Sequence, residues 1–223
     1  MTSSRTSARH WINERTGGMS VSQGPTLDFW LDRYRSGQTG WDRGGASPKL
    51  QSWLDGGLLA PPARIAVPGC GRGWEVATLA RLGFDVTGID YAADAVAAAR
   101  AHLATAGAHA TIVQADVLHW QPDAPFDVIY EQTCLCALHP DLWVAYGTAL
   151  SQWLRPGGLL LALFIQRPPA ESEGFVIGPP YHCDIHAMRA LFPASVWEWP
   201  KPPYPRVPHP NGMHELAIEL RRR

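Results

Sequence analysis

A glycine cluster at the end of an apolar run is the feature of this sequence best suited to chemistry. The run 63–68 ends in glycines at alternate positions, which predicts a strand that turns tightly into a helix. Glycine has no Cβ, so such a turn lets bare backbone approach a ligand. Asp90 follows the next apolar run, where a carboxylate suits the hydroxyls of a ribose. The residues expected at this nucleoside-containing cofactor are Gly69, Cys70, Gly71, Gly73, Asp90 and Tyr91.

The spacing of the glycines favours one cofactor over another. A dinucleotide fingerprint, G-x-G-x-x-G, needs glycine or alanine three places after Gly71, where the helix packs and opens its N-terminus to a pyrophosphate. This chain has Trp74 there. Its G-x-G-x-G form is common in enzymes that use S-adenosylmethionine, which has a ribose and an adenine but no phosphate. We therefore expect S-adenosylmethionine as the cofactor and S-adenosylhomocysteine as its product.

Each of these residues also has a structural explanation. The glycines could form an ordinary strand-to-helix turn, Asp90 could cap the helix that follows it, and Asp116 could be a loop acid. The cluster between His182 and His186 has zinc-binding side chains, but its spacing does not fit a compact site. A helix capped by Asp184 explains that cluster, so we expect no metal.

Apolar runs alternate with helical stretches from Pro61 onward, which is typical of a parallel sheet covered on both faces. The alternation predicts an α/β fold, a doubly wound, seven-stranded and mostly parallel sheet with helices on both faces and an antiparallel last strand. This Rossmann-like architecture is the usual frame of class I methyltransferases. The expected strands are Arg64–Pro68, Asp85–Ile89, Ala110–Gln114, Phe126–Tyr130, Leu159–Ile165, Val196–Trp199 and His214–Leu220. The expected helices are Trp74–Leu82, Ala92–Ala106, Asp141–Leu154 and Ile185–Leu191.

The segment 200–212 is dense in proline, and we expect it to stay out of the sheet because proline cannot donate to a ladder. It is either a stiff surface loop or a wall on the substrate side of the sheet.

Length and composition set the broad class. With 223 residues and 46% hydrophobic content, the chain is large enough for one full α/β domain. We expect a mobile extension over 1–24 and a single domain over 25–223, with a helical lid over 25–60. A net charge of −1 gives no general attraction to nucleic acid. Four cysteines without a C-x-x-C motif, and no spanning or signal stretch, favour a cytoplasmic protein without a membrane partner, which we expect to be monomeric.

Several further motifs together resemble the thiopurine S-methyltransferase family. They cover Leu27 to about Phe192 and are similar in pattern to the plant-type halide and thiol methyltransferases. The motifs are Trp30 to Trp41, with a W-x3-W-x2-G-x-T-x-W-like pattern; Val67-Pro68-Gly69-Cys70-Gly71; Phe126 to Glu131; Cys136-Ala137-Leu138-His139-Pro140; and Gly178-Pro179-Pro180-Tyr181.

The resemblance implies roles for particular residues. It places Trp30 and Trp41 in the walls of the cofactor site, although Trp30 could instead belong to the apolar side of an ordinary amphipathic helix. It implies Gly69 at the methionine side, Asp90 at the ribose, and Asp116 and Val117 around the adenine. Glu131 and Gln132 would lie where cofactor and acceptor meet, and Glu131 and Tyr181 are the expected catalytic or acceptor-facing residues.

The resemblance also implies the reaction, which is transfer of a methyl group to the sulfur of a small thiol or thiopurine-like substrate. A halide, sulfide, selenium or tellurium species is a related acceptor. Gln132 stands where the animal thiopurine enzymes carry arginine, which argues against thiopurines that bear a carboxylate. The alternatives are a tailoring methyltransferase with a non-thiol acceptor, an NAD-dependent oxidoreductase and a non-catalytic cofactor-binding module.

Overall fold

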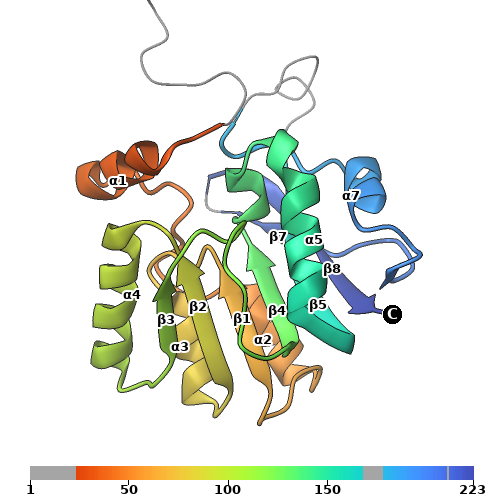
Figure 1. Cartoon of the computed structure of the whole chain (residues 1–223), viewed down its shortest axis with the longest axis horizontal. Helices are drawn as coiled ribbons and strands as arrows, with labels where there is room; N and C mark the ends of the chain where they lie inside the picture. The colour runs from red at the N-terminus through yellow and green to blue at the C-terminus, as the bar shows by residue number, and fades with distance from the viewer. Residues whose placement is uncertain (1–23, 168–177, 210) are drawn as a thin grey trace, which may run out of the picture.

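Eight strands form one mixed sheet within the part of the chain that the computed structural model describes, residues 24–167, 178–209 and 211–223. The strand order is β3-β2-β1-β4-β5-β8-β6, and β7 also pairs with β8. The first five strands are parallel to their neighbours, whereas β8 runs antiparallel to β5 (Figure 1). The strands are β1 Arg64–Pro68, β2 Asp85–Asp90, β3 Thr111–Gln114, β4 Phe126–Gln132, β5 Leu154–Gln166, β6 Trp197–Glu198, β7 Arg206–Pro208 and β8 His214–Arg222. The predicted α/β class, with a mostly parallel sheet and an antiparallel last strand, is confirmed.

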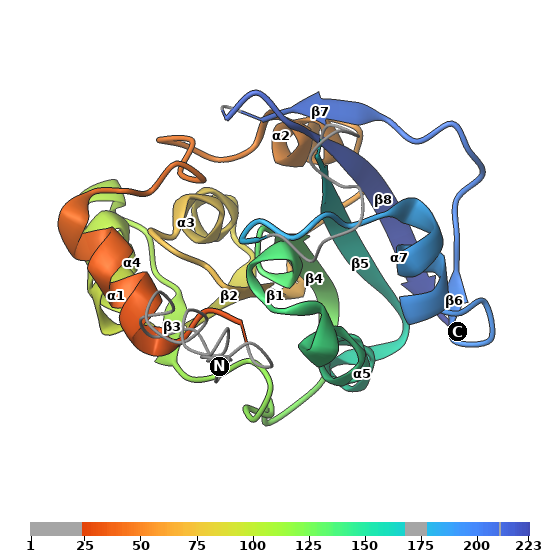
Figure 2. The same ribbon diagram turned by 90° about the horizontal axis from the view of Figure 1, so that it is seen from above.

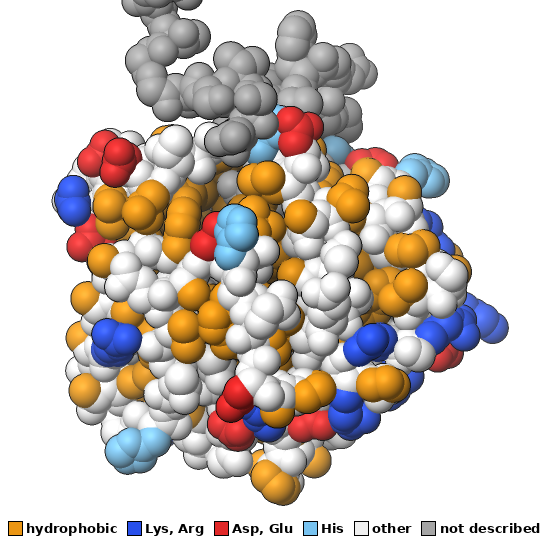
Figure 3. Space-filling view, viewed as in Figure 1, with side chains coloured by type: hydrophobic (Ala, Val, Ile, Leu, Met, Phe, Trp, Pro, Cys, Tyr) orange, Lys and Arg blue, Asp and Glu red, His pale blue; other side chains and the backbone are white. Residues whose placement is uncertain are grey.

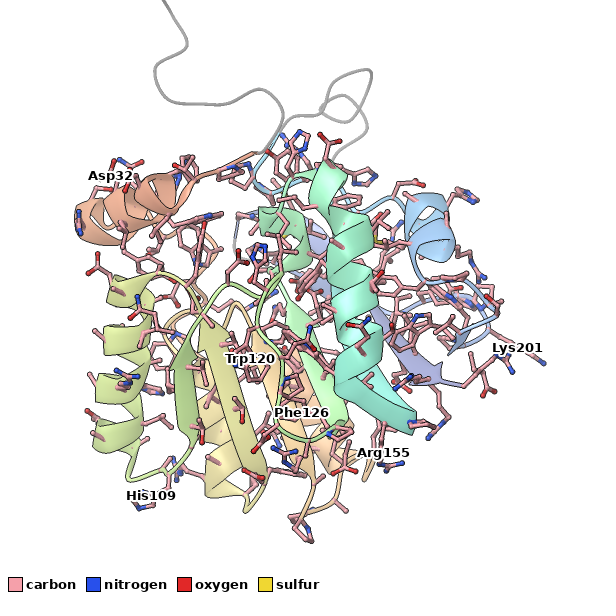
Figure 4. All side chains as sticks on the ribbon, viewed as in Figure 1. Asp32, His109, Trp120, Phe126, Arg155 and Lys201 are labelled. Carbon is pink, nitrogen blue, oxygen red and sulfur yellow. The ribbon has the colours of Figure 1, made fainter. Side chains whose placement is uncertain are left out.

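Helices cover both faces of the sheet because alternate side chains of its strands are apolar on both sides. In β4, Val128 belongs to the core cluster that includes side chains of α2, α3 and α4, whereas Ile129 belongs to the cluster that includes side chains of α5 and α7. Trp120 adds to the core on the α5 side of the sheet, where its ring centroid lies 5.0 Å from the ring centroid of Trp153 (Figure 4). The helices are α1 Leu27–Ser36, α2 Pro48–Asp55, α3 Trp74–Arg81, α4 Ala93–Ala106, α5 Trp143–Trp153 and α7 Ile185–Leu191.

Helix caps decide two of the structural alternatives. Asp184 caps α7 as expected, because its Oδ1 accepts hydrogen bonds from the backbone N–H groups of His186 and Ala187. Asp90 does not cap α4, whose N-cap is Ala92.

The proline-rich segment contradicts one expectation. Arg206–Pro208 forms β7 and pairs antiparallel with β8, so the segment 200–212 does join the sheet. Pairing is possible because β7 lies at the outer edge of β8, where proline is tolerated. The sheet therefore has eight strands, one more than the seven predicted.

Two boundaries differ from those expected around α5. The predicted helix Asp141–Leu154 begins as a separate 3₁₀ turn, Pro140–Leu142, before the α-helix starts at Trp143. The strand after it starts at Leu154 rather than Leu159, because Leu154 pairs with Phe126 before the register shifts and Leu159 pairs with Val128.

The N-terminal segment contains two helices with different surroundings. α1 buries none of its side chains and lies across the carboxyl-end edge of the sheet beside α4 (Figures 1 and 2). α2 is part of the core, since Leu50 and Trp53 are buried in it. Within the segment 25–60, α1 therefore lies over this edge, whereas α2 belongs to the core. Residues 1–23 of the predicted extension lie outside the described residues, and Gly24 is buried against His139.

Candidate active site

A cavity of about 420 Å³ opens at the carboxyl ends of the parallel strands, between α1 and the loop after β4. Ligands bind at this edge in open α/β sheets. Hydrophobic side chains gather on the neighbouring face, between α1 and α5 (Figure 3). The predicted site residues that line the cavity are Trp30, Trp41, Gly69, Asp90, Tyr91, Asp116 and Val117.

A hydrogen bond joins the glycine turn to the side chain of Asp90. The Asp90 Oδ2 accepts a hydrogen bond from the backbone N–H of Gly71 at 3.0 Å, and Oδ1 accepts one from Ala92 at 3.0 Å. Burial raises the pKa of Asp90, although these hydrogen bonds oppose the shift. Each carboxylate oxygen keeps a second lone pair, so Asp90 can also accept from a ligand in the cavity.

The turn also requires residues without a Cβ. Gly69 has φ of +59°, and a Cβ there would lie 2.9 Å from the Cβ of Cys134. Gly73 starts α3 at φ of +75° and lies against Ala99 of α4, so it serves helix packing and does not line the cavity. The bare backbone at Gly69 fits close approach by a cofactor.

A second cavity of about 60 Å³ adjoins the first on the other side of the turn. The two share Trp41, Gly69 and Thr133 as lining residues. Cys70, Gly71 and Gln132, which the sequence places at the cofactor, line this smaller cavity. Charged residues here are paired: Arg72 Nε lies 2.7 Å from Asp42 Oδ2, and Trp74 Nε1 donates to Asp42 Oδ1.

Aromatic rings form the wall beneath α1. The ring of Trp41 meets the rings of Trp30 and Tyr34 edge to face, with centroids 5.4 Å and 5.7 Å away. All three line the cavity although α1 buries no residue. The structure therefore places these rings on the cavity surface and outside the protein core.

Asp116 and Val117 line the cavity beyond the end of β3. The Asp116 carboxylate already has contacts within its own loop. Its Oδ1 accepts a hydrogen bond from the Leu118 N–H, and its Oδ2 lies 2.8 Å from His119 Nδ1. The Tyr91 side chain lies nearby, and burial raises its pKa.

The two expected catalytic residues do not line either cavity. Glu131 is 1% exposed, and its Oε1 accepts a hydrogen bond from the Leu135 N–H at 2.7 Å. Tyr181 is 3% exposed; its backbone N–H donates to Cys136 and its ring packs on His139. Both residues therefore support the loop that forms the cavity wall, one layer behind its surface. The strand-end position of Glu131 was visible in the sequence, but the direction of its side chain was not.

Gln132 and Glu215 form a buried polar network beside the cavities. The Tyr130 hydroxyl donates to Gln132 Oε1, and Gln132 Nε2 donates to both oxygens of Glu215. Arg43 Nη2 donates to Glu215 Oε2 at 2.7 Å. Burial raises the pKa of Glu215 to about 7 against the attraction of Arg43, and burial raises the pKa of Glu131 to about 7 as well.

Several residues that line the cavity were not predicted as site residues. The loop after β4 contributes Thr133, Cys134, Cys136, Ala137, Leu138 and His139, and the proline-rich segments contribute Pro179, Pro180, His209 and Asn211. Some of these residues lie in the sequence motifs described above. The sequence of a loop that follows a strand does not show which of its side chains point into the cavity. All four cysteines of the chain lie in the described residues and are free.

The fold is that of solved methyltransferases. A structure titled "Conversion of a Disulfide Bond into a Thioacetal Group during Echinomycin Biosynthesis" aligns with a TM-score of 0.72 and 24% identity, over 88% of this chain and 92% of that one. The 1,6-didemethyltoxoflavin-N1-methyltransferase of Burkholderia thailandensis, solved with S-adenosylhomocysteine, aligns with a TM-score of 0.69 and 21% identity, over 88% of this chain and 86% of that one. The chain therefore has the fold of class I S-adenosylmethionine-dependent methyltransferases.

Sequence comparison identifies the family within this class. The family described as Thiopurine S-methyltransferase matches residues 25–201. The chain is 30% identical to "Probable thiol methyltransferase 2" of Arabidopsis thaliana over 70% of this chain and 67% of that protein. It is 30% identical to a Thiopurine S-methyltransferase of Pseudomonas putida (strain GB-1), over 69% of this chain and 76% of that protein. The chain belongs to the thiopurine S-methyltransferase family and uses S-adenosylmethionine, which overturns the oxidoreductase alternative.

Within the described residues, none of the helices has both the length and the apolar character needed to cross a bilayer.

Proposed function

We propose that this enzyme methylates the sulfur of a small thiol, or a related soft nucleophile such as thiocyanate, sulfide or a halide. The observation that carries the proposal is one cavity with two different ends. One end has Asp90, Asp116 and the aromatic rings under α1, and the other has the apolar side chains of Leu138, Leu142 and Ile165. A cofactor bound at the first end and a small acceptor bound against these apolar side chains can therefore meet within one cavity.

We place the cofactor by the chemistry of the lining residues. Asp90 would accept from the ribose hydroxyls, and Asp116 and Val117 would lie at the adenine. The bare turn at Gly69 and the smaller cavity beyond it would hold the methionine end, whose charged groups suit the polar lining there. Trp30 and Trp41 would face the sulfonium, which aromatic rings attract by about 0.5–2 kcal/mol.

S-adenosylmethionine supplies the methyl group when bound: the acceptor sulfur forms the new C–S bond, and the old C–S bond breaks with its electron pair passing to the cofactor sulfur. The chain's residues need only align the acceptor and exclude water. A thiol of ordinary pKa near 8.5 is already partly ionised at neutral pH, so no strong base is required. This requirement agrees with Glu131 lying behind the cavity wall rather than in it.

The acceptor end also limits which substrates fit. In the described structure, the residues that follow β4 or β5 and line this cavity include no lysine or arginine. Gln132 is engaged by Tyr130 and Glu215 and does not replace the arginine of the animal enzymes. We therefore propose small acceptors that carry no charge apart from the reacting group, rather than thiopurines that bear a carboxylate. We further propose that the protein is cytoplasmic, which the four free cysteines support, and that it is a monomer.

A methyl-transfer assay across thiols, thiocyanate, halides, thiopurines and non-sulfur acceptors tests the proposal, with products identified by mass. We expect turnover with small thiols or thiocyanate above that with any oxygen or nitrogen acceptor. Turnover confined to non-sulfur acceptors would establish the tailoring alternative instead. Absence of turnover with every acceptor, together with intact binding of S-adenosylhomocysteine, would leave a cofactor-binding module.

A further inference from the structure

His209 is a buried histidine in the wall of the larger cavity that none of the predicted roles uses. It follows β7 and is 5% exposed. Its Nε2 atom is buried and has no hydrogen-bond partner among the described residues. An unpaired buried polar atom normally costs about 1–3 kcal/mol, so its presence on a cavity wall points to a ligand.

The local backbone holds His209 in place. Its N–H donates to the Met213 carbonyl at 3.0 Å, and the Gly212 N–H donates to the His209 carbonyl at 3.0 Å. Arg43 Nη1 donates to the carbonyl of the preceding residue, Pro208, while its Nη2 is paired with Glu215. The ring is therefore presented by a braced turn at the end of a paired strand.

The proton on the ring can be assigned from its contacts. Nδ1 accepts a hydrogen bond from the backbone N–H of Asn211 at 3.4 Å, so in the neutral ring the proton is on Nε2. Burial lowers the pKa of His209; a hydrogen bond with the Asn211 side chain opposes this shift, and the charge of Arg43 adds to it. At neutral pH the ring thus offers an N–H donor from Nε2 and has no proton-accepting nitrogen free.

The position of His209 assigns it to the acceptor rather than to the cofactor. β7 pairs with the start of β8, and the same part of β8 pairs with the carboxyl end of β5 at Phe164–Gln166. The glycine turn and Asp90 follow β1 and β2, which are separated from β8 by β4 and β5. His209 therefore follows a strand on the β5–β8 side of the sheet, and it lines the cavity together with Ile165 at the end of β5.

We infer that His209 Nε2–H donates a hydrogen bond to the acceptor and so favours a soft monoanion, a thiolate or thiocyanate, over an uncharged acceptor. This inference rests on the proposed function. A hydrogen bond to an ionised acceptor is stronger than one to a neutral acceptor, so the donor favours the nucleophilic form. His209 keeps its proton throughout; the proton of a thiol passes to solvent before the acceptor binds.

The test compares three substitutions of different reach. His209→Gln places an amide N–H near the position of Nε2, whereas His209→Asn is shorter and His209→Ala has no donor. Binding of thiocyanate to each protein saturated with S-adenosylhomocysteine is measured by titration calorimetry, and KM is measured separately for thiocyanate, for hydrosulfide and for S-adenosylmethionine. We expect the Ala and Asn variants to bind thiocyanate about 10-fold or more weakly, and the Gln variant to recover most of that loss. The KM for S-adenosylmethionine should stay within about 2-fold of wild type in all three.

Two results would overturn the inference. One is unchanged thiocyanate affinity in His209→Ala; the other is equal loss in all three variants accompanied by weaker cofactor binding, which would show a structural role. The proposed function fails separately: wild-type protein that binds thiocyanate but methylates none of the thiol, thiocyanate, sulfide and halide acceptors would disprove it and leave the role of His209 in binding intact.

Discussion

Asp90 illustrates how a single carboxylate can serve the fold and a ligand together. Its two oxygens already accept the N–H groups of Gly71 and Ala92, which hold the glycine turn against the end of β2. The side chain nevertheless lines the cavity and has unused lone pairs. A ribose hydroxyl that donates to it would leave no buried polar group unpaired.

Replacing Asp90 should weaken cofactor binding markedly. Asp90→Ala removes the acceptor for the ribose and loosens the turn, so we expect a loss of about 1–3 kcal/mol, or roughly 5- to 150-fold in the Kd for S-adenosylhomocysteine. Calorimetry measures this Kd. Asp85→Asn, on an exposed residue of the same strand, is the matched control and should leave Kd unchanged. An unaltered Kd in Asp90→Ala would remove Asp90 from the site.

Glu131 should make stability depend on pH. Its pKa is about 7 in the folded protein against an ordinary 4.5, because burial penalises its charged form. Between these values the native state holds a proton that the unfolded state has released, so stability falls as pH rises through this window. Two to three pKa units correspond to about 3 kcal/mol.

Glu131→Gln should remove this dependence. Denaturant unfolding at pH 5 and pH 8 should show wild type losing about 2–3 kcal/mol more than the variant between the two. Glu198→Gln, which changes an exposed carboxyl on β6, controls for the loss of one charge. Parallel curves for wild type and Glu131→Gln would show that Glu131 ionises without penalty.

At the scale of elements, α1 and α2 separate ligand binding from stability. They are neighbours in the sequence, but α1 buries no side chain and lines the cavity, whereas α2 buries Trp53 against Tyr130 and the sheet. An amphipathic pattern alone is typical of both. The contact surface of each helix distinguishes a lid from a core helix.

A tryptophan on each helix tests this separation. Trp30→Ala should change the free energy of unfolding by less than about 1 kcal/mol, yet raise the Kd for S-adenosylmethionine by about 2- to 30-fold through the lost aromatic contact. Trp53→Ala should cost about 3–5 kcal/mol of stability because it leaves a core cavity. Chemical denaturation and cofactor titration measure both quantities for each variant. A large stability loss in Trp30→Ala would make α1 an ordinary packed helix.

At the scale of the whole molecule, one buried network joins the two ends of the described chain. Arg43, which follows α1, pairs with Glu215 of β8, and Gln132 of β4 binds the same carboxylate. The paired side chains are 11% and 0% exposed. Arg43 thereby holds the segment after α1 against the edge of the sheet that carries β7 and His209.

Breaking this pair should be costly. Arg43→Leu leaves Glu215 buried without its cation, and we expect a loss of about 3–5 kcal/mol in unfolding free energy. The exposed pair of Arg35 and Asp94 is the control, for which Arg35→Leu should cost less than about 1 kcal/mol. The double variant Arg43→Leu with Glu215→Leu should recover much of the stability. Equal small losses in both single variants would show that Glu215 does not need Arg43.

The sequence by itself determined the glycine turn, the succession of parallel strands along the chain and the helices between them, because each depends on local periodicity or on residues adjacent in the chain. It also placed the glycine turn and Asp90 at one site, since carboxyl ends of parallel strands meet at one edge, while the family resemblance added Trp30, Trp41 and Asp116. Only the tertiary structure decided that Glu131 and Tyr181 lie behind the cavity wall, that Arg206–Pro208 pairs with β8, and that His209 lines the cavity while its Nε2 has no partner among the described residues. These outcomes depend on register and on contacts between residues far apart in the chain, which local pattern does not specify.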